Sequence, residues 1–184
     1  MNAKTWIAGV VGGIVLFIWG SIAHVATPLG STGISSMPNE DAVMDAMRAN
    51  ITQPGLYFFP GIVGNQDEAA MKAWEEKAKR GPNGIMVYQL RSEGALLPSL
   101  LITEAVSNII VGLLAAIVLS QIAGSLAFRA SMAGLIALIG SVDIYGSYWN
   151  WYKFPTDYTL AQIVVLFIGY ILMGATIAAI AKKP

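Results

Sequence analysis

Residues 160–181 read LAQIVVLFIGYILMGATIAAIA and contain no charged side chain. The hydrocarbon core of a bilayer is about 30 Å thick, and a helix of roughly 20 predominantly apolar residues crosses it. This stretch therefore predicts a transmembrane helix, and it makes an integral membrane protein the first hypothesis for the chain.

Three other stretches are also long and apolar enough to cross a membrane. They cover residues 6–26, residues 96–128, where Gly124 is expected to break the helix late, and residues 130–151. Aromatic residues collect at the headgroup level of membranes. A group of them ends the last stretch, namely Tyr145, Tyr148, Trp149, Trp151 and Tyr152.

A long segment with a mixed polar pattern lies between the first two predicted spans, and its pattern is typical of a small folded domain. The pattern predicts four elements in order, namely a helix over residues 36–53, a strand over 56–59, a helix over 65–80 and a strand over 85–90. Two strands alone are marginally stable. We therefore expect this domain to lean on the membrane helices or on a partner.

Together these patterns predict an all-α membrane protein with four transmembrane helices and a small extracytoplasmic α+β domain. The expected boundaries are residues 1–26 for the first helix, 27–95 for the inserted domain and 96–184 for the other three helices.

The composition agrees with this class of protein and excludes several others. Only 12% of the 184 residues are charged, whereas soluble domains carry about 25%. Eleven basic and eleven acidic residues give no net charge, which argues against nucleic-acid binding because such binding needs a basic surplus. The chain has no cysteine and one histidine, which excludes disulfides, cysteine-ligated metals and two-histidine haem or metal sites within one chain.

Basic residues in the short segments predict the orientation. Cytoplasmic loops are enriched in lysine and arginine, and one side of the predicted bundle carries Lys4, Arg129, Lys182 and Lys183 without any acidic residue. We therefore expect a multi-pass protein of the bacterial inner membrane with both termini in the cytoplasm. The first apolar stretch is longer than the core of a typical signal peptide, so we expect it to remain as a helix.

Four short motifs occur in the first half of the chain. They are Trp19-Gly20-Ser21 followed by His24, then Pro28-Leu29-Gly30, Met37-Pro38-Asn39-Glu40, and the run from Pro54 to Gly61. Through them the chain resembles an uncharacterised family of small bacterial membrane proteins. The resemblance implies a bacterial membrane protein of this arrangement, and it implies no activity and no catalytic residue.

Polar side chains in the outer half of the predicted bundle form the candidate site. They are His24 in the first helix, Glu104 and Asn108 in the second, Asp143 and Ser147 in the third, and Gln162 in the fourth. Residues four apart share a helix face, and ionisable residues inside a membrane usually face protein or water. We therefore expect a polar pocket open to the outside. Hydrogen bonding between helices explains the same residues without any ligand.

Catalysis and metal binding have weak support in the sequence. One histidine and two carboxylates from three helices form a poor pattern of metal ligands, and Ser21 beside His24 lacks the turn that exposes a nucleophilic serine. We therefore expect no enzyme, no metal and no cofactor.

Small residues predict close helix packing. Gly9 and Gly13 form a G-x-x-x-G face on the first helix, and such faces let two helices approach closely. We expect this face to contact the third transmembrane helix or a second copy of the chain.

The leading functional hypothesis is an accessory, structural or assembly subunit of a larger membrane complex. Its expected partners are the lipid bilayer and other membrane subunits or a second copy. The alternative is a transporter, channel or ligand-binding protein that uses the polar pocket for a small solute, a proton or a cation.

Overall fold

The computed structural model describes residues 2–62, 67–90 and 98–181. It divides the chain into two compact units. The first unit contains Met1–Ser35 and Leu96–Pro184, and the second contains Ser36–Ala95.

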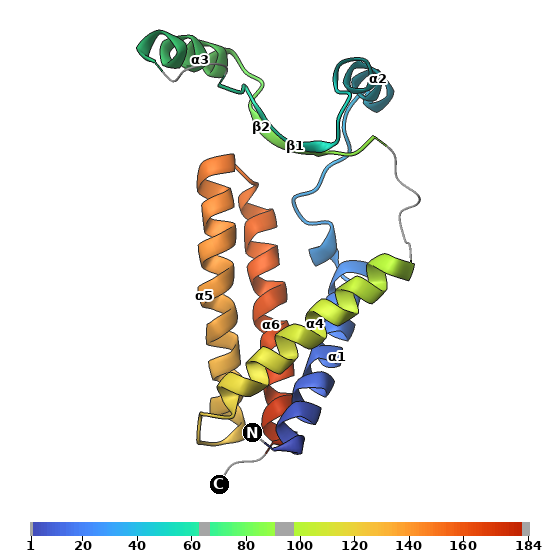
Figure 1. Cartoon of the computed structure of the whole chain (residues 1–184), viewed down its shortest axis with the longest axis vertical. Coiled ribbons are helices and arrows are strands. Elements are labelled where there is room, and N and C mark those ends of the chain that lie inside the picture. The colour runs from blue at the N-terminus through green and yellow to red at the C-terminus, as the bar shows by residue number, and fades with distance from the viewer. Residues whose placement is uncertain (1, 63–66, 91–97, 182–184) are drawn as a thin grey trace. The chain divides into compact units, whose positions relative to one another are not determined.

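The first unit is built from four long helices, which are α1 (Ala3–Val25), α4 (Pro98–Leu119), α5 (Leu126–Tyr152) and α6 (Thr156–Ile180). Within the described part of the chain, all four are long and apolar enough to cross a membrane. This confirms the prediction of four candidate spans. Figure 1 shows that α1 begins and α6 ends at the same end of this unit. We call it the terminal end, and we call the opposite end, where α5 turns into α6, the hairpin end.

The second span is shorter than the sequence predicts. α4 ends at Leu119 rather than near Phe128, and a turn over residues 120–125 follows it. Gly124 has a φ of +135°, a conformation that glycine adopts far more readily than other residues. The Ser125 hydroxyl then caps α5 by accepting the Phe128 amide at 3.2 Å. The expected helix start at residue 96 lies outside the described residues.

The four helices pack in the order α4, α1, α6 and α5. α1 packs along both α4 and α6, and α6 packs along α5, whereas α4 touches α5 only briefly. A short 3-10 turn, η1 (Pro28–Gly30), follows α1 and contacts both α1 and α6.

The glycine face of α1 meets α4. A Cβ atom added to Gly13 would lie 2.5 Å from the Ile109 Cα atom, and one added to Gly9 would lie 2.9 Å from the Leu113 Cα atom. The prediction that this face contacts the third transmembrane helix is therefore wrong. The physical reason is that Gly112 of α4 offers a matching site without a side chain, against the backbone of Gly9 and Gly13.

α5 uses its own small residues against α6. Its buried positions include Ala130, Ala133, Gly134 and Ala137. A Cβ atom on Gly174 of α6 would collide with the Ala133 side chain. This face of α5 is therefore filled by α6 and is not available to α1.

A tryptophan joins α1 to α6. The Trp19 indole donates to the Val165 carbonyl at 2.8 Å. Gly169 allows this contact, because a Cβ atom there would lie 2.8 Å from the Cδ1 atoms of both Leu16 and Trp19.

The core of the first unit lies in the half near the terminal end. It includes Leu16, Ala116, Leu119, Met173 and Ile177. The buried residues of α4 begin only at Gly112. A Cβ atom on Gly20 of α1 would meet nothing within 4 Å, although Gly20 lies seven residues after Gly13. α4 therefore packs against α1 around Gly9 and Gly13, and Figure 1 shows it running obliquely across α1, so that its first turns lie away from α5 and α6.

The second unit has the predicted order of elements. α2 (Glu40–Asn50), β1 (Gly55–Phe59), α3 (Glu68–Arg80) and β2 (Gly84–Tyr88) follow one another. The strands are antiparallel, and Gly55 pairs with Tyr88 while Phe59 pairs with Gly84. The expected start of the second helix at residue 65 lies outside the described residues, and the Asp67 carboxylate caps α3 by accepting the Ala70 amide at 2.8 Å.

The second unit has almost no core. Neither α2 nor α3 contains a buried residue, and among residues 36–62 and 67–90 only Pro60 and Tyr88 are buried. Two contacts support the ribbon, namely the hydrogen bond from the Trp74 indole to the Pro60 carbonyl at 2.8 Å and the edge-on packing of Tyr57 against Tyr88.

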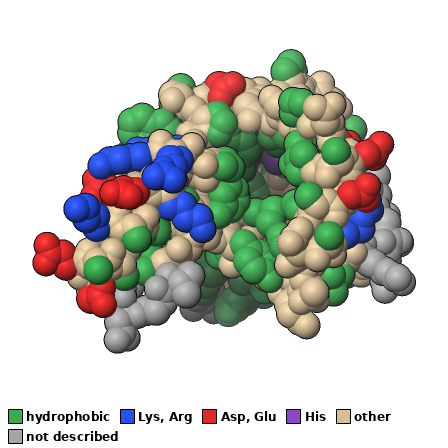
Figure 2. Space-filling model, turned by 90° about the horizontal axis from the view of Figure 1, so that it is seen from above, with side chains coloured by type: hydrophobic (Ala, Val, Ile, Leu, Met, Phe, Trp, Pro, Cys, Tyr) green, Lys and Arg blue, Asp and Glu red, His purple; other side chains and the backbone are tan. Residues whose placement is uncertain are grey.

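α3 carries a solvated charged surface. Basic and acidic side chains lie next to one another on the left of Figure 2, where α3 is placed. Lys79 lies 2.8 Å from Glu75, and its hydrogen bond to the carboxylate, together with its charge, lowers the pKa of Glu75. Such exposed pairs contribute little to stability.

Candidate functional site

His24 lies at the end of α1 with an exposed side chain. Its Nδ1 atom is 2.9 Å from the Gly20 carbonyl, one turn earlier in the same helix. The hydrogen bonding of the ring is therefore local, and no hydrogen bond joins it to another predicted site residue within the described chain.

Glu104 and Asn108 form a pair on α4. The Asn108 amide donates to the Glu104 carboxylate at 2.7 Å and to the Glu104 carbonyl at 2.8 Å. The predicted sharing of one helix face is therefore realised as a direct contact. Glu104 itself is exposed, so no other described helix covers this carboxylate.

The side chains of the remaining predicted residues form no hydrogen bond or ion pair with any described residue. Asp143 and Ser147 are exposed on α5, and Gln162 is 9% exposed on α6. Among the hydrogen bonds and ion pairs of residues 2–62, 67–90 and 98–181, none involves these three side chains. The described residues also contain no group of three or more histidine, aspartate or glutamate side chains that could hold a metal ion.

A groove lies between α4 and α5, with α6 as its floor. One cavity of about 230 Å³ is lined by residues of all three helices, including Val111, Val118, Ile136 and Tyr170. A neighbouring cavity of about 190 Å³ shares Ile136 and Tyr170 and extends along α5 past Gly140. We call these two adjoining cavities the α4–α5 groove.

Two of the predicted polar residues, Glu104 and Asn108, continue the α4 wall of this groove. On α4, one stripe with spacings of four and three residues consists of Glu104, Asn108, Val111, Ala115 and Val118. Such spacings place side chains on one helix face. The α4 wall is therefore apolar towards the terminal end and polar towards the hairpin end. On α5, the residues that line the groove beyond Gly140 are Ser141, Ile144 and Tyr145, and neither Asp143 nor Ser147 is among them.

An aromatic cluster closes the hairpin end. The rings of Tyr145, Tyr148, Phe154 and Tyr158 contact one another in a closed circuit, with centroids 5.3–6.5 Å apart. Tyr152 packs against Tyr148 at 5.8 Å. Edge-on and tilted ring pairs of this kind stabilise a structure beyond the area that they bury. The cluster therefore holds the ends of α5 and α6 together.

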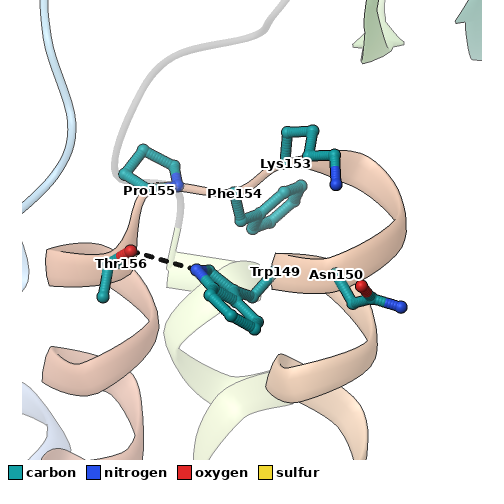
Figure 3. Close-up of a pocket in the computed structure, with 6 residues that line it drawn as sticks. All are labelled: Trp149, Asn150, Lys153, Phe154, Pro155 and Thr156. Carbon is teal, nitrogen blue, oxygen red and sulfur yellow. Dashed lines mark hydrogen bonds between the residues drawn. The ribbon is translucent and has the colours of Figure 1, made fainter.

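A cavity of about 300 Å³ adjoins the aromatic cluster and is shown in Figure 3. Its lining residues are Trp149, Asn150, Lys153, Phe154, Pro155 and Thr156. The Trp149 indole donates to the Thr156 hydroxyl at 3.0 Å. The cavity combines the ammonium group of Lys153, the amide of Asn150 and the rings of Trp149 and Phe154. Amphipathic aromatic rings and basic residues are typical of positions at the membrane surface.

Sequence reasoning found part of this end and missed the rest. It identified Tyr145, Tyr148 and Trp149 from their clustering, but not Phe154 and Tyr158. These two follow the turn at Lys153, which adopts a left-handed conformation with φ +58°. The aromatic composition of residues 145–158 was a usable signal.

Arg129 has a role that its sequence position did not indicate. It is 2% exposed, and its guanidinium donates to the carbonyls of Ala181 at 2.8 Å, Leu119 at 3.2 Å and Ala178 at 3.4 Å. The C-terminal ends of helices carry partial negative charge and unpaired carbonyls. Arg129 therefore caps α4 and α6 together from the first turn of α5.

Comparison with protein-family models, with curated proteins and with solved structures gives no match. The resemblance to a family of small bacterial membrane proteins therefore stays a prediction.

Proposed function

We propose that this chain is a non-enzymatic assembly or structural subunit of a larger complex in the bacterial inner membrane. The observation that carries the proposal is the uncovered first half of α4. No residue between Pro98 and Val111 is buried, although this stretch carries Glu104 within a candidate span.

An exposed carboxylate within a membrane span is costly. Insertion scales place the cost of a charged residue at the centre of a helix at about 2.5–3.5 kcal/mol. Asn108 provides Glu104 with one hydrogen-bond partner from a side chain, whereas Asp143 has none among the described residues. A neighbouring subunit that covers these faces would offset the cost.

The second unit supports the same function. Its helices α2 and α3 bury no residue, and Leu56 and Val87 of the two strands are 68% and 72% exposed. A two-stranded ribbon with so little core is marginally stable alone. Contact with another protein would give it the burial that it lacks.

Extraction from the native membrane in a mild detergent tests the proposal. We expect the chain, which has a mass of 19.6 kDa, to migrate in a larger particle together with other membrane proteins. A chain that is monomeric and carries a bound small molecule would contradict the proposal. It would support instead a solute, proton or cation site built from the residues His24, Glu104, Asn108, Asp143, Ser147 and Gln162.

We also propose that the terminal end faces the cytoplasm and the second unit lies outside it. Lys4 and Arg129 at the terminal end support this orientation. The chain has no cysteine, so single cysteines can be labelled without background. In intact cells, a membrane-impermeant thiol reagent should label the Thr52→Cys variant and not the Ser131→Cys variant. The opposite labelling pattern would reverse the orientation.

A further inference from the structure

The cavity of Figure 3 lies at the turn between α5 and α6, which are two of the four candidate membrane spans. Where a short turn joins two spans, the turn lies outside the hydrocarbon core, at the level of the lipid headgroups. The volume of about 300 Å³ is at the lower end of the range for small-molecule sites. The cavity therefore suits a small chemical group at the membrane surface.

The walls of the cavity are held in place by the chain itself. The Lys153 amide donates to the Tyr148 carbonyl, and the Phe154 amide donates to the same carbonyl at 3.4 Å. The Phe154 ring packs against the Tyr148 ring at 5.3 Å. Below this turn in Figure 3, the bond from the Trp149 indole to the Thr156 hydroxyl joins α5 to α6. A site that is already ordered loses less freedom when it binds a ligand.

The polar groups of the lining are available as hydrogen-bond donors. In the part of the chain that the structure describes, Lys153 forms no ion pair and the Asn150 side chain forms no hydrogen bond. Thr156 accepts the Trp149 indole, so the hydrogen of its own hydroxyl remains free to donate. No aspartate or glutamate is among the described lining residues. Such a set of donors, one of them charged, suits an acceptor that carries negative charge.

The start of α6 adds backbone donors to this set. Pro155 precedes the helix without a side-chain cap, so the first amides of α6 lack helical partners and carry partial positive charge. The carboxylate of Asp157 is directed elsewhere. Its Oδ1 atom accepts the Tyr158 amide at 2.9 Å and would lie 2.9 Å from a Cβ atom added to Gly33, which lines a different cavity. The acceptor position beside Lys153 therefore stays open.

We propose that this cavity binds the phosphate group of an anionic phospholipid such as phosphatidylglycerol. Lys153 and Thr156 donate to the phosphate oxygens, and the rings of Trp149 and Phe154 lie against the glycerol and the upper acyl chains. A zwitterionic lipid offers the same phosphate, but its own ammonium group already neutralises that charge, so the lysine favours the anionic lipid. The site rests on the membrane placement in the proposed function and is independent of assembly with other subunits.

The experiment uses the full chain in a nonionic detergent and phospholipids that carry a pyrene group on one acyl chain. Energy transfer from tryptophan to pyrene measures binding, since Trp149 lines the cavity. Phosphatidylglycerol and phosphatidylcholine are compared, because they share the phosphate and the acyl chains and differ in net charge. We expect phosphatidylglycerol to bind about fivefold more tightly, which corresponds to the contribution of about 1 kcal/mol from one lysine near an anionic membrane surface.

Two variants assign this preference to the cavity. Lys153→Gln removes the charge and keeps a flexible polar side chain at the same backbone position, so the two lipids should bind equally. Lys4 is exposed at the terminal end, so the matched control Lys4→Gln removes the same charge from the opposite end of the unit. This control should keep the full preference for phosphatidylglycerol.

Equal binding of the two lipids to the wild-type chain would overturn the inference, and so would an unchanged preference in the Lys153→Gln variant. Inorganic phosphate, added at constant ionic strength, separates a lipid from a soluble phosphate compound. It should leave the bound phosphatidylglycerol in place, and displacement would overturn the assignment to a lipid. Each of these results leaves co-purification with other subunits unaffected, so the proposed function stands or fails separately.

Discussion

Replacement of Arg129 by methionine tests whether a buried cation holds the terminal end together. Methionine has a comparable length and is apolar, so it fills the space but donates no hydrogen bond. Two bonds of good length would be lost, to Ala181 at 2.8 Å and to Leu119 at 3.2 Å, and the longer bond to Ala178 counts for little.

Hydrogen bonds from a charged donor contribute about 1.5–3 kcal/mol each, which gives about 3–6 kcal/mol for two. Removal of the charge also removes the cost of burying it, which offsets part of that sum. We expect the Arg129→Met variant to lose about 2–4 kcal/mol. Arg129→Lys should lose about half as much, because an ammonium group lacks the planar fork that reaches two helix ends.

The measurement is unfolding of the purified chain in mixed detergent micelles, followed by tryptophan fluorescence during titration with a denaturing detergent. The matched control is Lys4→Met, which removes one positive charge from the terminal end at an exposed position. If Arg129→Met unfolds at the same denaturant fraction as Lys4→Met, the cap contributes no net stability and the reasoning above is refuted.

Four further substitutions test the packing of the first unit, each by thermal unfolding in detergent. Gly13→Leu should cost about 3 kcal/mol or more, because its Cβ would lie 2.5 Å from the backbone of Ile109, whereas Gly20→Leu has free space and should stay within about 0.5 kcal/mol of the wild type. Equal losses would show that the crossing point of α1 and α4 is misplaced. Trp19→Phe keeps a ring but loses the hydrogen bond to α6, so a destabilisation of about 0.5–1.5 kcal/mol is expected, and an unchanged melting temperature would contradict it. Phe154→Ala removes two ring contacts and should cost about 1–3 kcal/mol; a smaller effect would mean that the aromatic cluster does not fasten the hairpin end.

The candidate spans and the order of elements in the inserted unit could be predicted because both depend on local properties. Apolar length identifies a span, and Gly81 ends the second helix of the insert where the structure ends it, whereas the first helix ends at Asn50, before the predicted stop at Pro54. The sequence did not predict that α4 ends at Leu119. Residues 120–123 contain no charged side chain, glycine or proline that would mark a helix end, and the chain turns only because of the conformation around Gly124.

Partners of helix faces could not be predicted in the same way. The G-x-x-x-G pattern of Gly9 and Gly13 identifies a face but not the helix that meets it. Small residues occur on α4 and α5 alike. The glycine face of α1 packs on α4 because Gly112 lies against the backbone of Gly9 and Gly13 at the same time. The burial of Arg129 was hidden for a related reason, because the carbonyls that it binds belong to residues 10, 49 and 52 positions away.

The candidate site was predictable as a set of helix faces and not as a single pocket. Glu104 and Asn108 are in contact as their spacing indicates. The other predicted residues stay apart from this pair, because the first turns of α4 lie away from α5 and α6 and the packing of α4 on α1 sets this course.

The contact between α1 and α4 also has a consequence for how the chain tolerates change. These two helices are neighbours in space although the whole second unit separates them in sequence. Their glycine contacts, and the tryptophan bond from α1 to α6, hold α1 in place without help from the connection. The entropy of closing a flexible loop rises only slowly with its length. The insert therefore occupies a position where segments can be lengthened, shortened or exchanged at little cost to the bundle, and a chain cut there should still reassemble from its two pieces.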